Sequence, residues 1–312
     1  MNATVPYIDE SALFELVPFG DAVSALGRCL AAGLDPAASL QRSIHDLEHG
    51  QLLLMPAETP DAVGVKLSTV APGNPDRDLP RVQGFYVLYD PSTLTPCALL
   101  DGTALTTLRT PAISAVAVDH LARRDADHLL VFGSGPQAWG HVEAIRAVRP
   151  LRQVTVVGRN QARADDLVAR LRGTGLEASV GTAESVAQAD VVVCATTSRQ
   201  PLFDGGLLRD GACVVAVGSH EPDARELDDK TLGRAARVVV ETRSVAMREA
   251  GDVIQAVGSG ALSADELIDL GELVRLEPAA GTSVFKSVGM GWQDLVVAEV
   301  AHRRWLEDQR RV

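Results

Sequence analysis

The stretch between Leu129 and His141 has the residue types and the spacing of a phosphate-binding turn. The apolar run Leu129–Phe132 predicts a buried strand, and a helical pattern begins at Pro136. Between them the sequence reads G-x-G-x-x-A, in which Gly133 permits a tight turn and Gly135 lets the backbone approach a pyrophosphate. The free N–H groups of the following helix would hold that pyrophosphate. We therefore predict a dinucleotide site formed by Gly133, Gly135, Pro136, Gln137 and Ala138.

The end of the second predicted strand bears on which dinucleotide binds. An acidic residue at this point would accept hydrogen bonds from the ribose hydroxyls of NAD, but the chain reads Val157-Gly158-Arg159-Asn160. Arg159, with Asn160 beside it, is placed for the 2′-phosphate of NADP. The sequence therefore favours NADP(H), and the alternative is NAD(H) bound through hydroxyl and backbone contacts.

Polar side chains also follow three later apolar segments, where an open parallel sheet binds its ligand. Thr197 follows the fourth predicted strand, and Ser219 and His220 follow the fifth. Phe285–Gly289 is expected to be a late loop in which Ser287 suits contact with a ligand. We expect Thr197, Ser219 and Ser287 to contact the cofactor and His220 to lie near its nicotinamide end.

Three cations stand in or just past apolar segments of the N-terminal part, namely Arg42, Lys66 and Arg109. Cations on half-buried strands are costly unless they are paired, and three of them together would form a site for a carboxylate or a phosphate. The alternative for each is a surface cation with a buried stem, or a structural ion pair. Thr110-Pro111 predicts a helix start near Pro111. Arg109 should then stand just outside the positive end of that helix, where it also counts among the cofactor-binding residues.

The elements before residue 121 predict a small α+β domain. An extended start is followed by an amphipathic helix whose apolar positions run from Leu13 to Leu30. Dense turn residues separate the later strands at 71–75. The predicted strands are Ser39–Ile44, Gln51–Met55, Ala62–Val70, Val82–Tyr89 and Pro96–Leu100.

From Leu129 to about Val240, short apolar runs alternate with helical segments, which predicts a doubly wound parallel sheet. The runs are Leu129–Phe132, Val154–Val157, Ala178–Val180, Val191–Cys194, Cys213–Val217 and Val238–Val240. A last helix, Trp292–Trp305, is expected to pack partly on the first domain. The predicted fold class is thus α/β, with a Rossmann domain at 121–292 and a smaller α+β domain at 1–120, to which 293–312 return.

Composition limits the partners and the compartment. The 312 residues carry a net charge of −12, which argues against nucleic acid and anionic membranes because both require a basic surface. No apolar run approaches the ~20 residues needed to span a bilayer. The four cysteines are scattered, and neither they nor the histidines and carboxylates show metal-ligand spacing, so we predict no metal. Without a visible secretory signal, a cytoplasmic location is expected.

Six segments together resemble the ornithine cyclodeaminase/mu-crystallin family, and the resemblance extends over nearly the whole chain. They are Gly64–Leu67, Ala71–Pro75, Leu105–Thr110, Gly133–Ala138, Arg225–Asp228 and Phe285–Gly289. The resemblance implies a homodimer with an N-terminal substrate-binding and dimerisation domain. It also implies a small α-amino or α-imino acid as substrate. By position, Arg42, Lys66 and Arg109 match the cations with which this family grips the substrate carboxylate and polarises the reacting centre.

One position departs from the cyclodeaminase pattern. Cyclodeaminases carry an aspartate just after the fifth strand, where this chain has His220, and Asp223 lies three residues later. Reducing a preformed imine needs only hydride, one proton and a carboxylate clamp, and histidine can supply a proton near neutral pH. We therefore expect an NAD(P)H-dependent reductase of a cyclic α-imino acid, such as pyrroline- or piperideine-2-carboxylate, with Lys66 and His220 as catalytic residues. The alternatives are an ornithine or lysine cyclodeaminase with tightly bound NAD, and a non-catalytic protein that binds NADPH and a small ligand.

Overall fold

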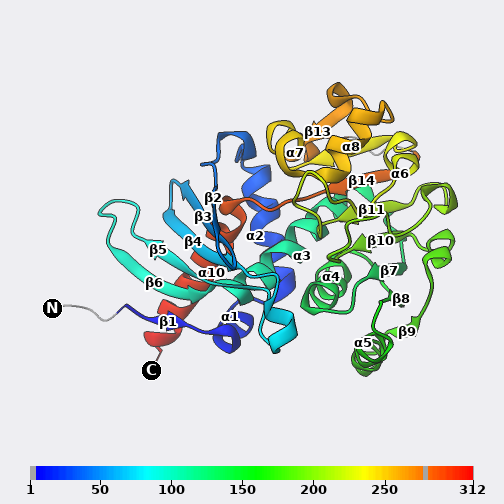
Figure 1. The fold of residues 1–312 in the computed structure, drawn as a ribbon. Helices are drawn as coiled ribbons and strands as arrows, with labels where there is room; N and C mark the ends of the chain where they lie inside the picture. Colours follow the sequence, from blue (N-terminus) through cyan, green and yellow to red (C-terminus); the bar gives the residue numbers. More distant parts are fainter. Residues whose placement is uncertain (1–4, 277–279, 312) are drawn as a thin grey trace. The chain divides into compact units, whose positions relative to one another are not determined.

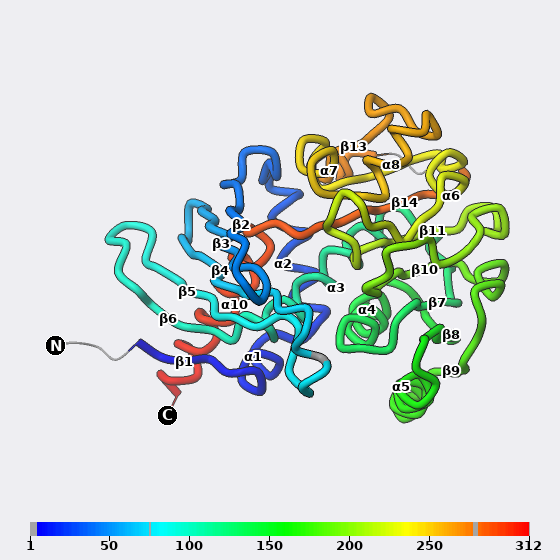
Figure 2. The backbone as a smooth tube through the Cα atoms, in the orientation of Figure 1, coloured from blue at the N-terminus to red at the C-terminus, as the bar shows by residue number. Residues whose placement is uncertain are grey.

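The computed structural model describes residues 5–276 and 280–311, and the chain divides into two compact units. Unit 1 holds the residues up to Arg109 and those from Met290 onward, and unit 2 holds Thr110–Gly289. The chain therefore passes between the units twice, once within a helix and once in a loop (Figure 2). The boundaries predicted from the sequence, after residues 120 and 292, lie further along the chain at both places.

Unit 1 is built on a six-stranded sheet in the order β1-β6-β5-β4-β3-β2. All its pairs are antiparallel except β1 with β6. The strands are β1 Tyr7–Ile8, β2 Ser43–Leu47, β3 Gly50–Thr59, β4 Ala62–Val70, β5 Val82–Tyr89 and β6 Pro96–Asp101. Of the strand predicted at Ser39–Ile44, only Ser43 and Ile44 belong to β2, because a 3-10 turn at Pro36–Ala38 precedes it and pairing with β3 begins only at Ser43. Arg42 therefore lies just before the strand.

The helices of unit 1 are α1 Glu10–Leu16, α2 Phe19–Ala31, the first part of α3 Gly102–Leu121, and α10 Gly291–Gln309. The single N-terminal helix predicted from the sequence is in fact two. Pro18 lacks an N–H and disfavours a helical residue before it, so α1 ends and α2 begins there. The long helix α10 packs against β3, β4, β5 and α2 (Figure 1).

The helix predicted to start near Pro111 starts nine residues earlier, at Gly102, and Pro111 lies inside it. The carboxylate of Asp101 accepts hydrogen bonds from the N–H groups of Thr103 (2.9 Å) and Ala104 (2.8 Å), and so caps the true start. An internal proline costs roughly 3 kcal/mol, but the residues from Leu108 to Val118 are buried and their packing offsets that cost. Arg109 is consequently a residue of the helix interior and not a neighbour of a helix N-terminus.

Unit 2 has an eight-stranded sheet in the order β13-β12-β14-β11-β10-β7-β8-β9, with every pair parallel. The strands are β7 His128–Phe132, β8 Gln153–Val157, β9 Glu177–Val180, β10 Val191–Cys194, β11 Cys213–Ala216, β12 Arg237–Val240, β13 Leu267–Asp269 and β14 Ser283–Lys286. All six predicted strands are confirmed. The strand order reverses between β7 and β10, which is the switch point of a Rossmann fold.

The helices of unit 2 are α4 Pro136–Arg146, α5 Gln161–Gly173, α6 Asp229–Gly233, α7 Arg243–Glu249, α8 Gly251–Ser259 and α9 Leu270–Leu273, besides the rest of α3. Short 3-10 turns lie at Asn74–Arg77 in unit 1 and at Ala183–Ala187, Gly205–Leu207 and Ala264–Glu266 in unit 2. The predicted late loop is wrong at its start, because Phe285 and Lys286 belong to β14, which lies between β11 and β12. A four-residue strand ending in lysine lacks the apolar pattern that marks its neighbours.

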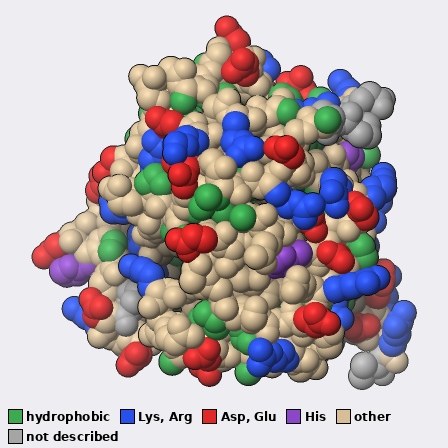
Figure 3. Space-filling view, turned by 90° about the vertical axis from the view of Figure 1, so that its right-hand side faces the viewer, with side chains coloured by type: hydrophobic (Ala, Val, Ile, Leu, Met, Phe, Trp, Pro, Cys, Tyr) green, Lys and Arg blue, Asp and Glu red, His purple; other side chains and the backbone are tan. Residues whose placement is uncertain are grey.

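Each unit has its own apolar core. In unit 2 the core gathers around the valines of β10, β11 and β12. In unit 1 it includes Leu13, Leu26 and Leu100. Acidic and basic side chains are interspersed on the face drawn in Figure 3. None of the helices within the described residues has the length and hydropathy needed to cross a membrane.

Candidate functional site

A buried ion-pair cluster in unit 1 brings two of the predicted cations together. Alternate residues of β4 face the packed side of the sheet, and Lys66 is one of them, with 3% of its surface exposed. Its ammonium group donates to both carboxylate oxygens of Asp294 (2.9 and 2.8 Å) and to the hydroxyl of Thr106 (3.2 Å). Asp294 lies in the first turn of α10 and is fully buried.

Arg109 completes this cluster from α3. Thr106 and Arg109 are three residues apart on the helix, so they share one face. The guanidinium donates through Nε to Asp294 (3.1 Å) and through Nη1 to the side-chain oxygen of Gln293 (3.0 Å). Two cations thus share one carboxylate, and the cluster keeps an excess of positive charge that suits an anionic ligand.

The surroundings of Lys66 lower its pKa from 10.5 to about 8. Burial is the largest cause, and the charges of Arg109 and Arg42 act in the same direction, while Asp294 opposes them. The contribution of Arg42 means that this third predicted cation lies within electrostatic reach of Lys66. A lysine with such a pKa can release its proton near neutral pH.

Tyr86 stands directly opposite Lys66 on β5, so both side chains leave the sheet on the same face. Burial, and next the charge of Asp294, hold the pKa of Tyr86 well above its usual value, so the phenol keeps its proton. Within the described part of the chain, the hydroxyl of Tyr86 and the indole nitrogen of Trp292 are buried side-chain atoms without a hydrogen-bond partner. A polar ligand or water could satisfy them.

The glycine-rich turn of unit 2 has the form that a dinucleotide requires. Gly133 has a φ of 112°, and a Cβ there would lie 2.5 Å from the carbonyl oxygen of Ala195, so only glycine fits. A Cβ at Gly135 would meet nothing within 4 Å, so its space is open to a ligand. Gly135 is the N-cap of α4 and makes no side-chain cap, which leaves N–H groups of the first turn for a bound anion. Pro136 and Gln137 open that helix, and Ala138, in its first turn, is buried.

Two of the predicted cofactor residues follow β8. Arg159 is exposed at the carboxyl end of the strand, in the place expected of a residue that reads the ribose. The side-chain oxygen of Asn160 accepts a hydrogen bond from the N–H of Arg163 (3.1 Å) and so caps α5. This gives Asn160 a structural reason to be there besides the predicted contact with the cofactor.

Four predicted site residues lie in the loops after three adjacent strands of the sheet, β10, β11 and β14. They are Thr197, Ser219, His220 and Ser287. Thr197 is exposed and His220 is half-buried. The hydroxyl of Ser219 donates to the carbonyl oxygen of Ala224, and that of Ser287 donates to the buried carboxylate of Glu241 (2.9 Å). Ser219 therefore holds its own loop, and Ser287 ties the loop after β14 to Glu241, which directly follows β12.

Asp223 belongs to an exposed ion-pair cluster. The guanidinium of Arg199, on the loop after β10, donates to Glu221 (2.6 Å) and to Asp223 on the loop after β11. The carboxylate of Asp223 is therefore paired with an arginine.

Sequence reasoning missed two groups of buried polar residues. In unit 1 it missed Asp294 and Gln293, which lie far along the chain from the cations that they bind. In unit 2 it missed Glu226, Asp252, Lys286 and Glu241, which hold loops at the carboxyl ends of the strands. Glu226 and Lys286 stood in quoted segments, yet nothing in those segments indicated the contacts.

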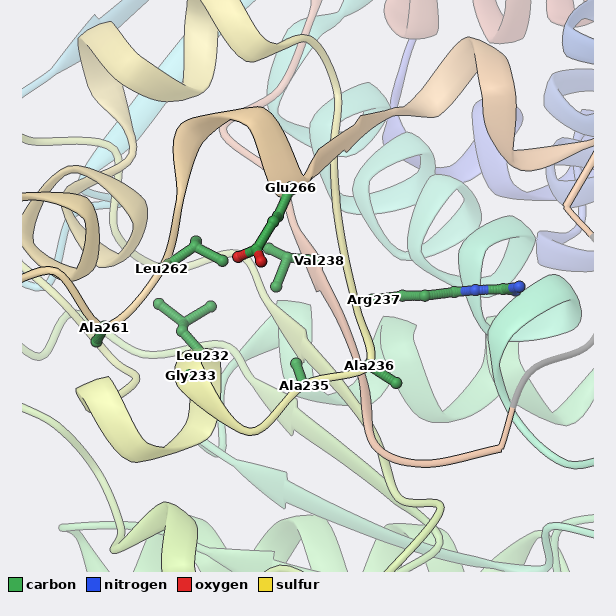
Figure 4. A pocket seen from close by; sticks show the side chains of 9 residues that line it. All are labelled: Leu232, Gly233, Ala235, Ala236, Arg237, Val238, Ala261, Leu262 and Glu266. Atoms are coloured by element: carbon green, nitrogen blue, oxygen red, sulfur yellow. The ribbon is translucent and has the colours of Figure 1, made fainter.

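A cavity of about 300 Å³ lies elsewhere in unit 2, at the start of β12 (Figure 4). It is therefore at the amino ends of the strands, whereas the predicted cofactor residues lie at their carboxyl ends. Leu232, Val238 and Leu262 line it, the carboxylate of Glu266 points in among them, and Arg237 extends away. None of the predicted site residues belongs to this cavity.

Unit 2 has the topology and the glycine turn of the Rossmann class of dinucleotide-binding proteins, to which unit 1 adds a buried, net positive cluster. The chain belongs to the ornithine cyclodeaminase/mu-crystallin family, whose family model matches residues 27–309.

The relatives and solved structures agree with this assignment. Delta(1)-pyrroline-2-carboxylate reductase from Colwellia psychrerythraea is 34% identical over 282 residues, covering 84% of this chain and 88% of that protein. Thermococcus litoralis Delta(1)-pyrroline-2-carboxylate reductase in complex with NADH and L-proline is 28% identical, with a TM-score of 0.91 and 98% of each chain covered. An archaeal alanine dehydrogenase dimer with bound NAD is 28% identical, with a TM-score of 0.90, covering 98% of this chain and 97% of that one.

Proposed function

We propose that this protein is an NAD(P)H-dependent reductase that converts a cyclic α-imino acid, such as pyrroline- or piperideine-2-carboxylate, to the cyclic amino acid. The observation that carries this proposal is the buried cluster in which Lys66 and Arg109 share the carboxylate of Asp294. It combines a proton donor with a pKa of about 8 and an excess of positive charge. The similarity to pyrroline-2-carboxylate reductases supports the substrate class.

Each group has a task in this reaction. Arg42 and Arg109 bind the carboxylate of the imino acid, which fixes the ring beside Lys66. The contact from Lys66 to Thr106, at 3.2 Å the longest of the three, is the one that the imine nitrogen replaces. As the C=N double bond becomes a single bond, the nitrogen takes a proton from the ammonium group of Lys66. The ammonium charge also stabilises the electron density that develops on the nitrogen.

The dinucleotide would be held by unit 2. The uncapped start of α4 and the open space at Gly135 fit its pyrophosphate. When bound, the reduced nicotinamide supplies the hydride that the imine carbon accepts. The net change is then one hydride and one proton added across the C=N bond.

An absorbance assay of the reduced nicotinamide tests the proposal. With NADPH or NADH and either cyclic imino acid, we expect the cofactor to be consumed in step with the imine. Ammonia release from ornithine or lysine without net cofactor consumption would instead identify a cyclodeaminase. Tight binding of NADPH without turnover of either imine would identify a binding protein.

For the cofactor, we propose a preference for NADPH that depends on Arg159. Replacing Arg159 with glutamate should lower kcat/KM for NADPH by about 10²-fold, because a charge that pairs with the 2′-phosphate becomes one that repels it. The same variant should change kcat/KM for NADH by less than about threefold.

Arg152 provides the matched control, since it is an exposed arginine at the opposite end of the same strand. Arg152→Glu should leave the ratio between the two cofactors unchanged. A wild-type enzyme that prefers NADH, or an Arg159→Glu variant with an unchanged ratio, would contradict the assignment of Arg159.

We also propose that the chain forms a homodimer through the outer face of the unit 1 sheet. Tyr7, Leu67 and Phe85 are 50%, 37% and 52% exposed. Leu67 is the cross-strand partner of Phe85, and the rings of Tyr7 and Phe85 lie 6.0 Å apart in an edge-to-face arrangement. An exposed patch of this kind is typical of an interface.

Phe85→Glu should convert the dimer to a monomer at micromolar concentration, because each interface would bury a new charge on both copies. Light scattering after size-exclusion chromatography measures the mass. Leu207→Glu is the control, since Leu207 is an exposed apolar residue of unit 2. A dimeric Phe85→Glu protein would show that another surface joins the copies.

A further inference from the structure

Glu226 is a fully buried carboxylate that joins two loops at the carboxyl edge of the unit 2 sheet. Its Oε1 accepts hydrogen bonds from the N–H (2.8 Å) and the hydroxyl (2.7 Å) of Thr196, in the loop after β10. Its Oε2 accepts from the N–H of Gly218 (2.7 Å), in the loop after β11. Every one of these partners donates, so an ionised carboxylate satisfies them all. Burial raises the pKa of Glu226, and the charge of Lys286 and the hydrogen bonds from Thr196 act against that rise.

Two further buried residues support Glu226. Asp252 accepts through Oδ1 from the N–H groups of Glu226 (2.7 Å) and Leu227 (2.8 Å), which orients the segment that carries the carboxylate. Lys286, at the end of β14, lies 2.9 Å from Oδ2 of Asp252 and donates to the carbonyl oxygen of Ser219 (2.6 Å). Its charge offsets part of the cost of burying two carboxylates.

The two loops are packed so closely that their positions depend on one another. A Cβ at Gly218 would lie 2.0 Å from the carbonyl oxygen of Thr196 and 2.5 Å from Oε1 of Glu226. On the exposed side, Arg199 joins the same two loops through Glu221 and Asp223. The loops are thus linked from the interior and from the surface.

The sheet order tells which half of a dinucleotide these loops would meet. The glycine turn after β7 takes the pyrophosphate at the switch point, and Arg159 after β8 stands on the adenosine side. β10 and β11 lie on the other side of β7, so their loops belong to the nicotinamide half. Thr197, Ser219 and His220 are all in them.

We propose that Glu226 is a positioning residue, whose carboxylate holds the loops after β10 and β11 in the arrangement that binds the nicotinamide half of the cofactor. The inference rests on the proposed function only in taking a nicotinamide dinucleotide as the ligand. Without this acceptor, the N–H groups of Thr196 and Gly218 turn toward other partners and the loops separate.

The test is the Kd of NADPH and NADH, measured by nucleotide fluorescence for the wild type, Glu226→Gln and Glu226→Asp. Glu226→Gln should raise the Kd by about tenfold, since its amide puts a donor against a donor. Glu226→Asp keeps the charge but is one methylene shorter, so it should raise the Kd by a smaller factor. If the glutamine variant does not fold, the Kd of the aspartate variant tests the inference. The KM for the imine at saturating cofactor should change less than the Kd of the cofactor, because Glu226 bonds to Thr196 and Gly218 and not to Lys66 or Arg109.

Asp190→Asn is the matched control. Asp190 is also buried, and it accepts from the N–H groups of Asp127 (3.1 Å) and His128 (3.2 Å), but at the opposite edge of the sheet. The Asp190→Asn variant should have a lower melting temperature than the wild type and the same Kd for either dinucleotide. Unchanged Kd values in both Glu226 variants, an equal rise in Asp190→Asn, or a wild type that binds neither dinucleotide would overturn the inference. A wild type that binds the cofactor but does not reduce either imine would refute the proposed substrate. The Kd values would still test whether Glu226 positions the loops that bind the cofactor.

Discussion

Replacing Lys66 with methionine is expected to lower kcat/KM for imine reduction by about 10³-fold. Methionine preserves much of the length and apolar character of the lysine stem but removes the proton donor and its charge. The imine nitrogen then has to take its proton from water, and no ammonium group stabilises the charge that develops on it. The loss should appear mainly in kcat, measured with saturating cofactor.

His220→Asn is the comparison that separates the two predicted proton donors. If Lys66 delivers the proton, the His220 variant should lose less than about tenfold in kcat. Both variants should bind NADPH with a Kd close to that of the wild type if neither holds the cofactor. A 10³-fold loss in His220→Asn together with a nearly active Lys66→Met would transfer the proton step to the histidine.

Replacing Asp294 with asparagine is expected to move the pH dependence of the reaction. In the wild type, kcat/KM should fall as the pH rises through about 8, because Lys66 then loses its proton. The charge of Asp294 raises the pKa of Lys66, whereas burial, Arg109 and Arg42 lower it. Without that charge the pKa of Lys66 drops further, so the falling limb of the profile should move to lower pH. Profiles of kcat/KM for the two proteins measure the shift.

Titration of Lys66 affects the stability of the fold in the opposite direction to the activity. Loss of activity can therefore be distinguished from unfolding. The pKa of Lys66 is lower in the folded chain, about 8, than its ordinary value of 10.5. Between these values the folded chain binds fewer protons than the unfolded one, so titration of Lys66 makes the free energy of unfolding rise with pH. Loss of activity above pH 8 through this group is therefore not loss of the fold, and circular dichroism at each pH checks this.

Asp294→Asn should also lower the free energy of unfolding, by roughly 3–5 kcal/mol, because it leaves two buried cations without their shared anion. The profile is therefore measured at a temperature at which the variant is folded. A limb that stays at the wild-type pH would show that Asp294 does not govern the proton on Lys66.

Much of unit 2 was predictable because its signals are local. A parallel strand buried on both faces is a short apolar run, and each of the six predicted runs is a strand. The turn Gly133–Ala138 carries its own context of strand and helix. β14 escaped prediction because it ends in Lys286, a charge that only its partner Asp252 makes tolerable inside the sheet.

A local sequence pattern gave a wrong helix start where burial of the helix had the larger effect. Thr110-Pro111 has the residue types of a helix start, yet α3 begins at Gly102, where Asp101 supplies the cap. Burial of the helix interior outweighs the cost of Pro111, and no single-sequence pattern reports that burial. The predicted position of Arg109, just outside a helix N-terminus, is therefore wrong, whereas its choice as a candidate cation depended on the neighbouring apolar segment and on the family resemblance and not on the helix start.

The sequence by itself determined the class of this protein, because the glycine turn, the apolar runs and the family segments are contiguous in the chain. Only the tertiary structure revealed Asp294 as the partner of Lys66 and Glu226 as the link between two loops. Lys66 and Asp294 are 228 residues apart. A carboxylate becomes the partner of a particular lysine only when strand and helix are packed together, since burial makes the pairing necessary and proximity makes it available.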